Sequence, residues 1–396
     1  MIQISPETQL FIREHSSDDV RALALQAKKY PDIDMPTAIT QIAGRQVAAE
    51  KIPSWREIEE IWYPKHLSLE QCSSEITARY KARLLQGDSL TDLTGGFGID
   101  CSFLATGFKS ATYVERQEEL CEIAAHNFPI LNLNHINVRN EDGVAYLQSM
   151  SPVDCIFLDP ARRNEHGGKT VAISDCEPNV AELEALLLSK ANRVMIKLSP
   201  MLDLSLALKE LKHTQEVHIL SVNNECKELL ILLGQTSPAE IAIHCVNLLT
   251  KGTQEEQHLV FTREQEQRSQ CTYTASLGDY LYEPNASLLK AGAFRSIAAA
   301  YPVRKLHPNS HLYTSDSFIE NFPGRIFRIA NQCSLNKKEV KENLADLKKA
   351  NVTVRNFPAT VTELRKRLHL TEGGDTYLFA STLNNGQKVI IRCEKV

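Results

Sequence analysis

Three acidic positions end three short β-rich runs of the sequence, and the first of them opens a glycine-rich loop. The segments are Asp92-Leu93-Thr94-Gly95-Gly96-Phe97-Gly98, then Glu115, then Glu141-Asp142-Gly143. The carboxyl ends of parallel strands meet at one edge of a sheet, so we expect the acids to surround the loop. Glu115 is then placed to accept the hydroxyl groups of a ribose, and Asp142 to accept an adenine amino group.

The glycines of this loop let the backbone turn sharply and approach a ligand closely. Their spacing is not Gly-x-Gly-x-x-Gly, so the dinucleotide-binding fingerprint is missing. The acids would also repel a pyrophosphate. A cationic adenosine cofactor therefore fits this edge better, and a nicotinamide-dependent dehydrogenase is disfavoured.

Two further strand-like runs end in polar residues. The first ends in Asp159-Pro160-Ala161-Arg162-Arg163 and the second in Lys197-Leu198-Ser199-Pro200, so both reach the same edge. The two arginines could bind a phosphate or a carboxylate, or stack on a base. Lys197 could contact a substrate; the alternative interpretation is that it is an ordinary lysine of the strand without a role in function. The polar segment 164–170 could form a lid over the substrate.

The elements that must position these residues alternate between strand-like and helical runs from residue 88 onward. The strand-like runs are 89–94, 111–116, 136–140, 154–160, 193–200, 217–222 and 229–234. Strands separated by helix-length crossovers predict a doubly wound α/β sheet with parallel strands. The polar link between the last two runs is too short for a parallel crossover, so the sheet should finish with an antiparallel pair.

The segments on either side of this sheet have different patterns. The N-terminal part shows helical periodicity punctuated by prolines, and the C-terminal part reads β-α-β-α-β-β with Asn384-Asn385-Gly386 at its last hairpin. We expect a helical region at 1–75 and a sheet domain at 76–240. A connecting segment at 241–272, a small section at 273–320 and a final α+β domain at 321–396 should follow.

The glycine loop and the acids together resemble the class I S-adenosylmethionine-dependent methyltransferases, over about residues 75–235. The resemblance implies a seven-stranded Rossmann-like sheet and S-adenosylmethionine as the cofactor. In that family the first acid and the loop hold the methionine part, the second acid holds the ribose, and the third contacts the adenine. The implied cofactor-binding residues are Asp92, Thr94, Gly95, Gly96, Gly98, Glu115, Arg116, Asp142 and Gly143.

Class I methyltransferases that act on nucleobase amino groups carry an Asp/Asn-Pro-Pro-aromatic tetrad where this chain has residues 159–162. In that tetrad the Asp or Asn side chain and a prolyl carbonyl group position the amine that is methylated. This positioning supplies most of the rate enhancement of methyl transfer. The resemblance implies Asp159, Pro160 and Arg162 as catalytic residues, with Arg163 and Lys197 contacting substrate. Arginine in place of the aromatic removes a stacking platform for a flipped base. This departure argues against exocyclic-amine methylation more than against methyl transfer itself.

Downstream motifs narrow the resemblance to a bacterial group of methyltransferases with a C-terminal THUMP-like domain. These motifs are Asp-Pro-Ala-Arg-Arg, Lys-Leu-Ser-Pro, Tyr282-Glu283-Pro284-Asn285, Ala291-Gly292 and Leu312-Tyr313-Thr314-Ser315-Asp316. In that group a small ferredoxin-like section precedes the THUMP-like module. Because THUMP domains bind structured RNA, the resemblance implies an RNA substrate, either tRNA or rRNA.

The charge distribution favours the same module as a contact for RNA. The whole chain has a net charge of −5, but residues 321–396 hold 14 Lys and Arg against 7 Asp and Glu. Basic residues on its two predicted helices and their flanks are Lys337, Lys338, Lys341, Lys348, Lys349, Arg365, Lys366 and Arg367. Contacts with several phosphates would make binding steeply salt-dependent. A solvated basic face is the alternative interpretation.

Two other functions stay open: a methyltransferase for a small acidic molecule or a protein, and a cofactor-binding protein without catalysis. Ten cysteines without a Cys-x-x-Cys pair predict free thiols in a cytoplasmic protein. They indicate neither a disulfide scaffold nor a structural zinc site, and we expect no metal. No apolar run is long enough to span a membrane, so we expect no membrane partner. The sequence does not indicate the oligomeric state.

Overall fold

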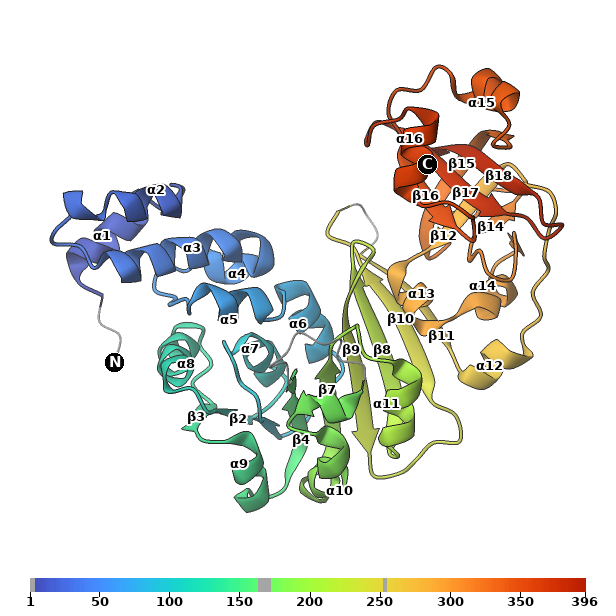
Figure 1. The fold of residues 1–396 in the computed structure, drawn as a ribbon. Coiled ribbons are helices and arrows are strands. Elements are labelled where there is room, and N and C mark those ends of the chain that lie inside the picture. Colours follow the sequence, from blue (N-terminus) through green and yellow to red (C-terminus); the bar gives the residue numbers. More distant parts are fainter. Residues whose placement is uncertain (1–3, 163–171, 252–254) are drawn as a thin grey trace. The chain divides into compact units, whose positions relative to one another are not determined.

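The computed structural model describes residues 4–162, 172–251 and 255–396 (Figure 1). Arg163 and the expected lid at 164–170 lie outside the described residues, as does the side chain of Arg162. The chain divides into two compact units, of which the first is Met1–Gln215 with Leu230–Pro238 and the second is Glu216–Leu229 with Ala239–Val396. Among the described residues, the helices are all too short or too polar to cross a membrane.

The first unit begins with helices, as the sequence predicted. They are α1 (Pro6–Glu14), α2 (Val20–Leu25), α3 (Met35–Lys51), α4 (Pro53–Arg56), α5 (His66–Gln71) and α6 (Glu75–Ala82). Asp19 and Asp34 begin α2 and α3 by accepting hydrogen bonds from backbone N–H groups of the first turn. Phe11, Leu23 and Ile42 are buried in the apolar core that these helices share.

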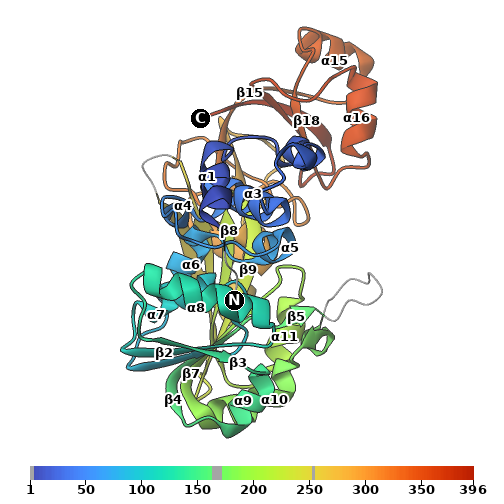
Figure 2. The same ribbon diagram turned by 90° about the vertical axis from the view of Figure 1, so that its left-hand side faces the viewer.

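A doubly wound parallel sheet follows, which confirms the predicted fold class. Its strands in this unit are β1 (Ser89–Asp92), β2 (Ser110–Glu115), β3 (Ile136–Asn140), β4 (Val153–Leu158) and β7 (Ala191–Leu198). The connecting helices are α7 (Ile99–Ala105), α8 (Glu118–Ile130), α9 (Gly143–Ser149) and α10 (Val180–Lys190), with α11 (Leu204–Glu210) after β7. Strand β1 pairs in parallel with β2 and β4, β2 with β3, and β4 with β7. Helices α7 and α8 lie on one side of the sheet and α9 and α10 on the other (Figure 2).

Helices on both faces bury the central strands completely. Phe157 in β4 is 1% exposed and Met195 in β7 is 0% exposed, within runs that are almost continuously apolar. Because these strands are parallel, their carboxyl ends share one edge, where Asp92 is paired with Phe157 and Glu115 with Asn140. After β4 the chain forms β5 (Ala161–Arg162), which pairs antiparallel with β6 (Cys176–Glu177).

The predicted antiparallel pair is confirmed in β8 (Thr214–Val222) and β9 (Glu225–Gly234). Asn223 and Asn224 alone join them, with φ angles of 48° and 70°. A two-residue hairpin turn favours asparagine because both positions take left-handed backbone angles.

The large sheet has two strands more than the seven expected. Strand β10 (Ala242–Leu248) runs parallel to β8, and β11 (Glu256–Phe261) runs antiparallel to β10, so the order is β11-β10-β8-β9-β7-β4-β1-β2-β3. The segment 241–272 reads as a polar connection because buried polar residues interrupt its apolar pattern. Asn247, for example, is 2% exposed but bonds to Asn224 and Gln257.

A second sheet forms the C-terminal part of the second unit, with strand order β13-β14-β12-β15-β18-β17-β16. Its elements are β12 (Tyr280–Pro284), α13 (Ala286–Ala291), α14 (Phe294–Ala300), β13 (Arg304–Lys305), β14 (Tyr313–Ser315), β15 (Gly324–Cys333), α15 (Lys337–Leu344), β16 (Asn351–Arg355), α16 (Val361–Leu368), β17 (Thr376–Thr382) and β18 (Lys388–Lys395). From β15 onward the order is β-α-β-α-β-β, as predicted. The last hairpin turns at Gly386, whose φ is 84°, and the core includes Leu281, Phe327 and Ile391.

Candidate active site

The loop after β1 is held in shape by the acid that precedes it. Asp92 is 1% exposed, and its Oδ1 accepts a hydrogen bond of 3.0 Å from the backbone N–H of Thr94. Gly98, with φ of 87°, then begins α7 in a left-handed conformation that glycine adopts without strain. The loop and the start of the helix therefore face the carboxyl edge of the sheet.

The loop also packs too tightly for side chains at two of the predicted positions. A Cβ atom on Gly95 would lie 2.2 Å from the ring of Tyr113, and one on Gly143 would lie 2.2 Å from the carbonyl oxygen of Leu93. Glycine at both positions thus lets the ends of β1, β2 and β3 approach one another closely.

Glu115, at the end of β2, fixes the loop from the other side. Its Oε2 accepts a hydrogen bond of 2.9 Å from the N–H of Gly96, and its Oε1 accepts one of 2.9 Å from the N–H of Gln117. Each carboxylate oxygen can accept more than one hydrogen bond, so capacity for a ligand's hydroxyl groups remains. Arg116 next to it points to the surface, with its guanidinium 3.7 Å from Glu177.

Asp142 begins α9 and has a structural role of its own. Its Oδ1 accepts hydrogen bonds of 3.0 Å from the N–H groups of Val144 and Ala145. The structure therefore places this exposed acid after β3, at the same edge as Asp92 and Glu115. Capping of α9 is by itself a sufficient reason for an aspartate at this position.

Asp159 joins the end of β4 to the glycine loop. Its backbone N–H donates a hydrogen bond of 2.6 Å to Oγ1 of Thr94. Its carboxylate is 37% exposed, and Oδ2 lies 2.7 Å from Nζ of Lys197 at the end of β7. Pro160, the next residue, is buried. Asp159 and Lys197 are thus brought together as an ion pair at the edge of the sheet.

This ion pair extends into a buried network that the sequence did not predict. Nζ of Lys197 also lies 3.2 Å from Oδ2 of Asp100, and Nζ of Lys81 lies 2.9 Å from Oδ1 of the same carboxylate. Ser73 donates a hydrogen bond of 2.7 Å to Asp100 and accepts one of 2.8 Å from Lys81. Lys81 is 0% exposed and Asp100 is 8% exposed, so these charged groups are almost completely desolvated.

The pKa values of two carboxyl groups in the network are shifted in opposite directions. Burial alone would raise the pKa of Asp100, but the positive charges of Lys81 and Lys197 outweigh it and hold that pKa well below its usual value. Desolvation raises the pKa of Asp159, against the opposing effect of Lys197. Asp100 therefore gains most from the positive charge in the network.

Asp92 has no such compensation. Its burial raises its pKa well above the usual value, and the neighbouring carboxylates of Asp100, Asp159 and Glu115 raise it further. Within the described part of the chain, neither Asp92 nor Glu115 has a cationic side chain within ion-pair distance. The ionised form of Asp92 is therefore disfavoured among the described residues, and a nearby positive charge would stabilise it.

The contacts of Asp100 with Lys81 and Ser73 were not predicted, for identifiable reasons. Asp100 stands in the first turn of a helix, where an acid is expected to interact with the helix dipole alone. Lys81 belongs to a helical run before the sheet, and lysine is rarely buried. The only signal was the order of the segments, which brings α6 directly before β1.

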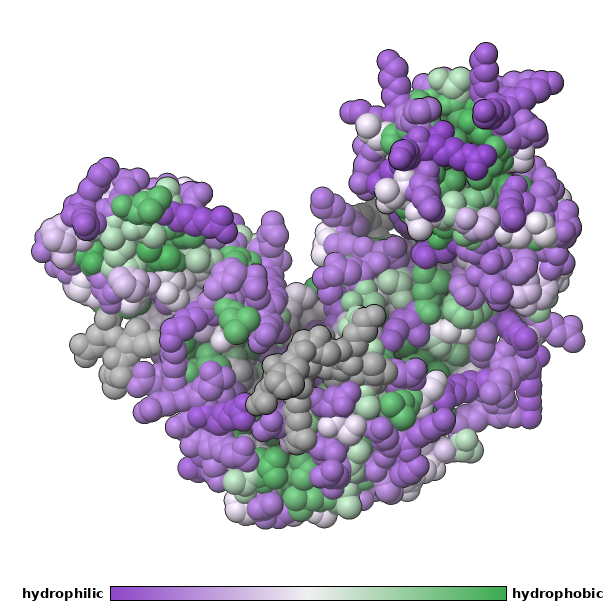
Figure 3. Space-filling view, in the orientation of Figure 1, coloured by the Kyte–Doolittle hydropathy of each residue, from purple (hydrophilic) through white to green (hydrophobic). Residues whose placement is uncertain are grey.

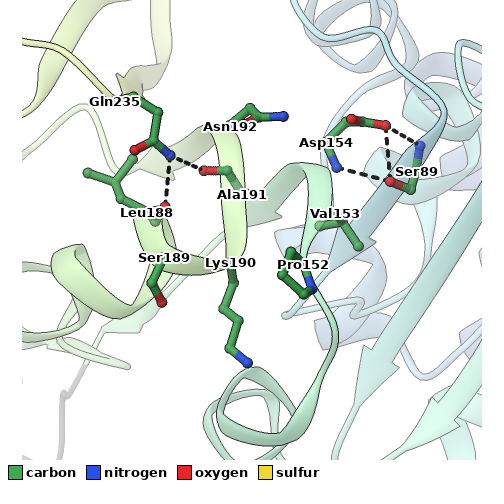
Figure 4. Close-up of a pocket in the computed structure, with 10 residues that line it drawn as sticks. All are labelled: Ser89, Pro152, Val153, Asp154, Leu188, Ser189, Lys190, Ala191, Asn192 and Gln235. Carbon is green, nitrogen blue, oxygen red and sulfur yellow. Dashed lines mark hydrogen bonds between the residues drawn. The ribbon is translucent and has the colours of Figure 1, made fainter.

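A shallow pocket lies at the opposite edge of the sheet, at the amino ends of β1, β4 and β7 (Figure 4). Its polar side chains already join neighbouring segments: Asp154 accepts hydrogen bonds from the backbone of Ser89, and Gln235 donates to the carbonyl groups of Leu188 and Ala191. The described residues that line it include none of the acids or glycines predicted to bind a cofactor.

The strand order, the glycine loop and the acids at successive strand ends define the class I methyltransferase fold. Comparisons with known proteins extend this to the whole chain. Residues 280–323 match a family model for a ferredoxin-like domain, and residues 324–395 match one for a THUMP-like domain. No curated protein matches the chain.

Solved structures give a full-length relative. The "putative methyltransferase" of Porphyromonas gingivalis W83 is 34% identical, with a TM-score of 0.87 over 100% of both chains. An rRNA methylase from Streptococcus thermophilus is 14% identical over 40% of this chain and 93% of that one, with a TM-score of 0.29. TrmK of M. capricolum, solved with S-adenosylhomocysteine, is 12% identical over 41% of this chain and 68% of that one, with a TM-score of 0.32. Neither of the last two scores is high enough to bear on the function of this chain.

The full-length similarity is decisive for classification. This chain belongs to the family of the Porphyromonas gingivalis protein. It combines a class I methyltransferase fold with C-terminal ferredoxin-like and THUMP-like domains.

We predict that Asp100→Asn strongly destabilises the first unit, because it leaves Lys81 and Lys197 buried without their shared carboxylate. The free energy of unfolding should fall by about 3 kcal/mol, as is typical for breaking a buried ion pair. Urea unfolding followed by circular dichroism measures this. The control is Asp88→Asn, whose partner Lys109 is 2.9 Å away but whose pair is 78% and 71% exposed; it should lose less than about 1 kcal/mol. Equal losses in the two variants would contradict the buried network.

We predict that Asp92→Asn stabilises the ligand-free protein at pH 7 by about 1 kcal/mol, as replacement of a destabilising functional group often does. The pKa of Asp92 is raised on folding, so the wild type loses stability as the pH rises from the unfolded pKa through the folded one. Asn keeps the acceptor for Thr94 and does not titrate. The gain should therefore vanish near pH 4, in urea unfolding at a series of pH values; a gain independent of pH would argue against a buried charge.

Proposed function

We propose that this protein transfers a methyl group from S-adenosylmethionine to a base in a structured RNA. The observation that supports this most is a pair of buried acids at the carboxyl edge of the sheet that lack a cationic partner among the described residues. Asp92 is 1% exposed and Glu115 is 9% exposed, and both face the glycine loop without a cationic partner among the described residues. A ligand that carries positive charge would supply that partner.

The residues at this edge fit the cofactor. Gly95 and Gly143 have no room for side chains because Tyr113 and Leu93 fill that space, so the ends of β1, β2 and β3 lie close together around the edge. In the roles that the family assigns, Asp92 and the loop hold the methionine part, Glu115 the ribose and Asp142 the adenine. S-adenosylmethionine, when bound, supplies a methyl group that is already activated by its sulfonium charge.

Asp159 and Pro160 would then position the acceptor. The carboxylate of Asp159 is exposed enough to accept a hydrogen bond from the acceptor group, and Lys197 holds it in place at 2.7 Å. Oriented in this way, the acceptor atom would direct a lone pair at the methyl carbon. As the new bond formed, the carbon–sulfur bond would break and S-adenosylhomocysteine would leave, while the proton of the acceptor would pass to water. Positioning of this kind accounts for most of the rate in such reactions.

The THUMP-like module supports RNA as the substrate. Lys337, Lys338 and Lys341 on α15, and Lys366 and Arg367 on α16, are exposed. The guanidinium of Arg367 donates a hydrogen bond of 3.0 Å to the carbonyl oxygen of Leu335, so the end of α16 lies next to the start of α15. Figure 3 shows hydrophilic side chains projecting from this module. Such a concentration of lysine and arginine is suited to phosphate groups.

We predict that substitutions of Glu115 and of Asp159 have different effects, the first on cofactor binding and the second on turnover. Glu115→Gln should weaken S-adenosylmethionine binding by about tenfold or more, since a hydrogen bond to a charged group contributes about 1.5–3 kcal/mol. Asp159→Asn should leave that affinity within about twofold and abolish turnover, because it contacts the acceptor and not the cofactor. Isothermal titration calorimetry measures the first, and transfer of labelled methyl to total RNA from a deletion strain measures the second.

The matched control is Glu118→Gln, which changes an exposed acid in the first turn of α8 and should alter neither quantity. Absence of cofactor binding to the wild type would contradict the methyltransferase proposal. Label found on protein or on small molecules in place of RNA would contradict the RNA part alone.

We also predict that RNA binding depends on the basic residues of α15 and α16. Replacing Lys337, Lys338, Lys366 and Arg367 by glutamine should weaken binding of tRNA or rRNA fragments and flatten its salt dependence. The slope of log K against log salt should fall by about 0.7–0.9 for each phosphate that is no longer neutralised. Fluorescence anisotropy at several salt concentrations measures both. Lys28→Gln with Lys29→Gln, at an exposed site in the first unit, is the control; no binding by the wild type at low salt would exclude RNA as a partner.

A further inference from the structure

Three histidines and a glutamate lie on one face of the strands β8, β10 and β11, within the second unit. His218 in β8 is paired directly with His244 in β10, and Glu216 stands two residues before His218. His258 in β11 is opposite Val246, which stands two residues after His244. Because side chains alternate between the faces of a strand, these four share one face.

The side chains lie close together. The ligand atoms of Glu216, His218 and His244 are all within 4.8 Å of one another. Nε2 of His218 lies 3.3 Å from Oε2 of Glu216, and Nδ1 of His244 lies 3.2 Å from Nε2 of His258. The rings of His218 and His244 are stacked, with centroids 4.3 Å apart.

We propose that Glu216, His218 and His244 bind a divalent transition-metal ion, with Zn²⁺ as the best match. Two imidazoles and one carboxylate are a donor set that zinc takes in proteins, and it leaves a fourth position for water or a further ligand. Calcium and magnesium prefer oxygen ligands and are disfavoured here. The expectation of no metal rested on the spacing of cysteines, whereas here the register of the sheet brings the ligands together.

His258 completes the arrangement as a positioning residue. Histidines that ligate metals usually engage their second ring nitrogen in a hydrogen bond, which fixes the tautomer and the ring orientation. The contact between Nδ1 of His244 and Nε2 of His258 does this and leaves Nε2 of His244 as the ligand atom.

The site needs only a small contraction to hold zinc. With bonds of about 2.1 Å in a tetrahedron, neighbouring ligand atoms lie about 3.4 Å apart. The distance between His218 and Glu216 already meets this value, and the others approach it after rotation of side chains. Glu216 and His244 are half-buried, so both can rotate, whereas His218 is 2% exposed and is held in place by packing. An ion there would join β8 to β10.

Zinc binding by the full-length, chelator-treated protein tests this proposal. We expect one Zn²⁺ per chain in calorimetric titrations under reducing conditions, and a higher midpoint of thermal unfolding with zinc. His244→Asn and Glu216→Gln should each lower the association constant by more than about tenfold. His66→Asn, a change at an exposed histidine on α5, should leave it unchanged.

A second measurement needs no variant and distinguishes this site from the free thiols. The Cu²⁺ complex of the wild type should show nitrogen coupling in its electron paramagnetic resonance spectrum, and the Co²⁺ complex should lack a thiolate charge-transfer band. A thiolate band, the absence of saturable binding, or equal affinity in the wild type and His244→Asn would each overturn the proposal.

Discussion

Negative charge at the carboxyl ends of the parallel strands is the constraint on which this structure depends. The protein balances the acids in and next to this edge unequally: Asp100, in the first turn of α7, has two lysines, Asp159 has one, and Asp92 has none among the described residues. Removing charges from water is costly unless they are paired. The lysines therefore allow the acids to be brought together, and Asp92 is the acid that the proposed cationic cofactor would compensate.

The N-terminal helices take part in this balance. Ser73 and Lys81, which contact Asp100, come from α6 and the turn before it. Trp55 and Tyr63 in the same region pack against Phe97 of the glycine loop. The helical region is thus part of the structural support of the loop, and it supplies half of the positive charge that Asp100 receives from lysine.

Much of this fold could be predicted because the spacing of apolar residues along the sequence indicates which faces of helices and strands are buried. The parallel strands are buried on both faces and read as apolar runs, and the hairpin at Asn223 is marked by its residue types. Strands β10 and β11 were not predicted as part of the sheet because they bury polar side chains such as Asn247. The hydrogen-bond partners of such side chains come from other strands and cannot be recognised in the sequence. For the same reason the acids at strand ends were predicted, whereas Lys81 as a partner of Asp100 was not: sequence shows where a charge stands along the chain but not which opposite charge it meets.

The hydrogen bond from the N–H of Asp159 to Oγ1 of Thr94 has a consequence for the order of events. It connects the loop that would hold the cofactor to the turn that would hold the acceptor, beside the hydrogen bond from the N–H of Leu93 to the carbonyl oxygen of Phe157. Thermodynamic reciprocity then requires that whatever factor one occupant adds to the affinity of the second, the second adds to the first. If this hydrogen bond couples the two sites, departure of the two products would be a linked process and not two independent ones.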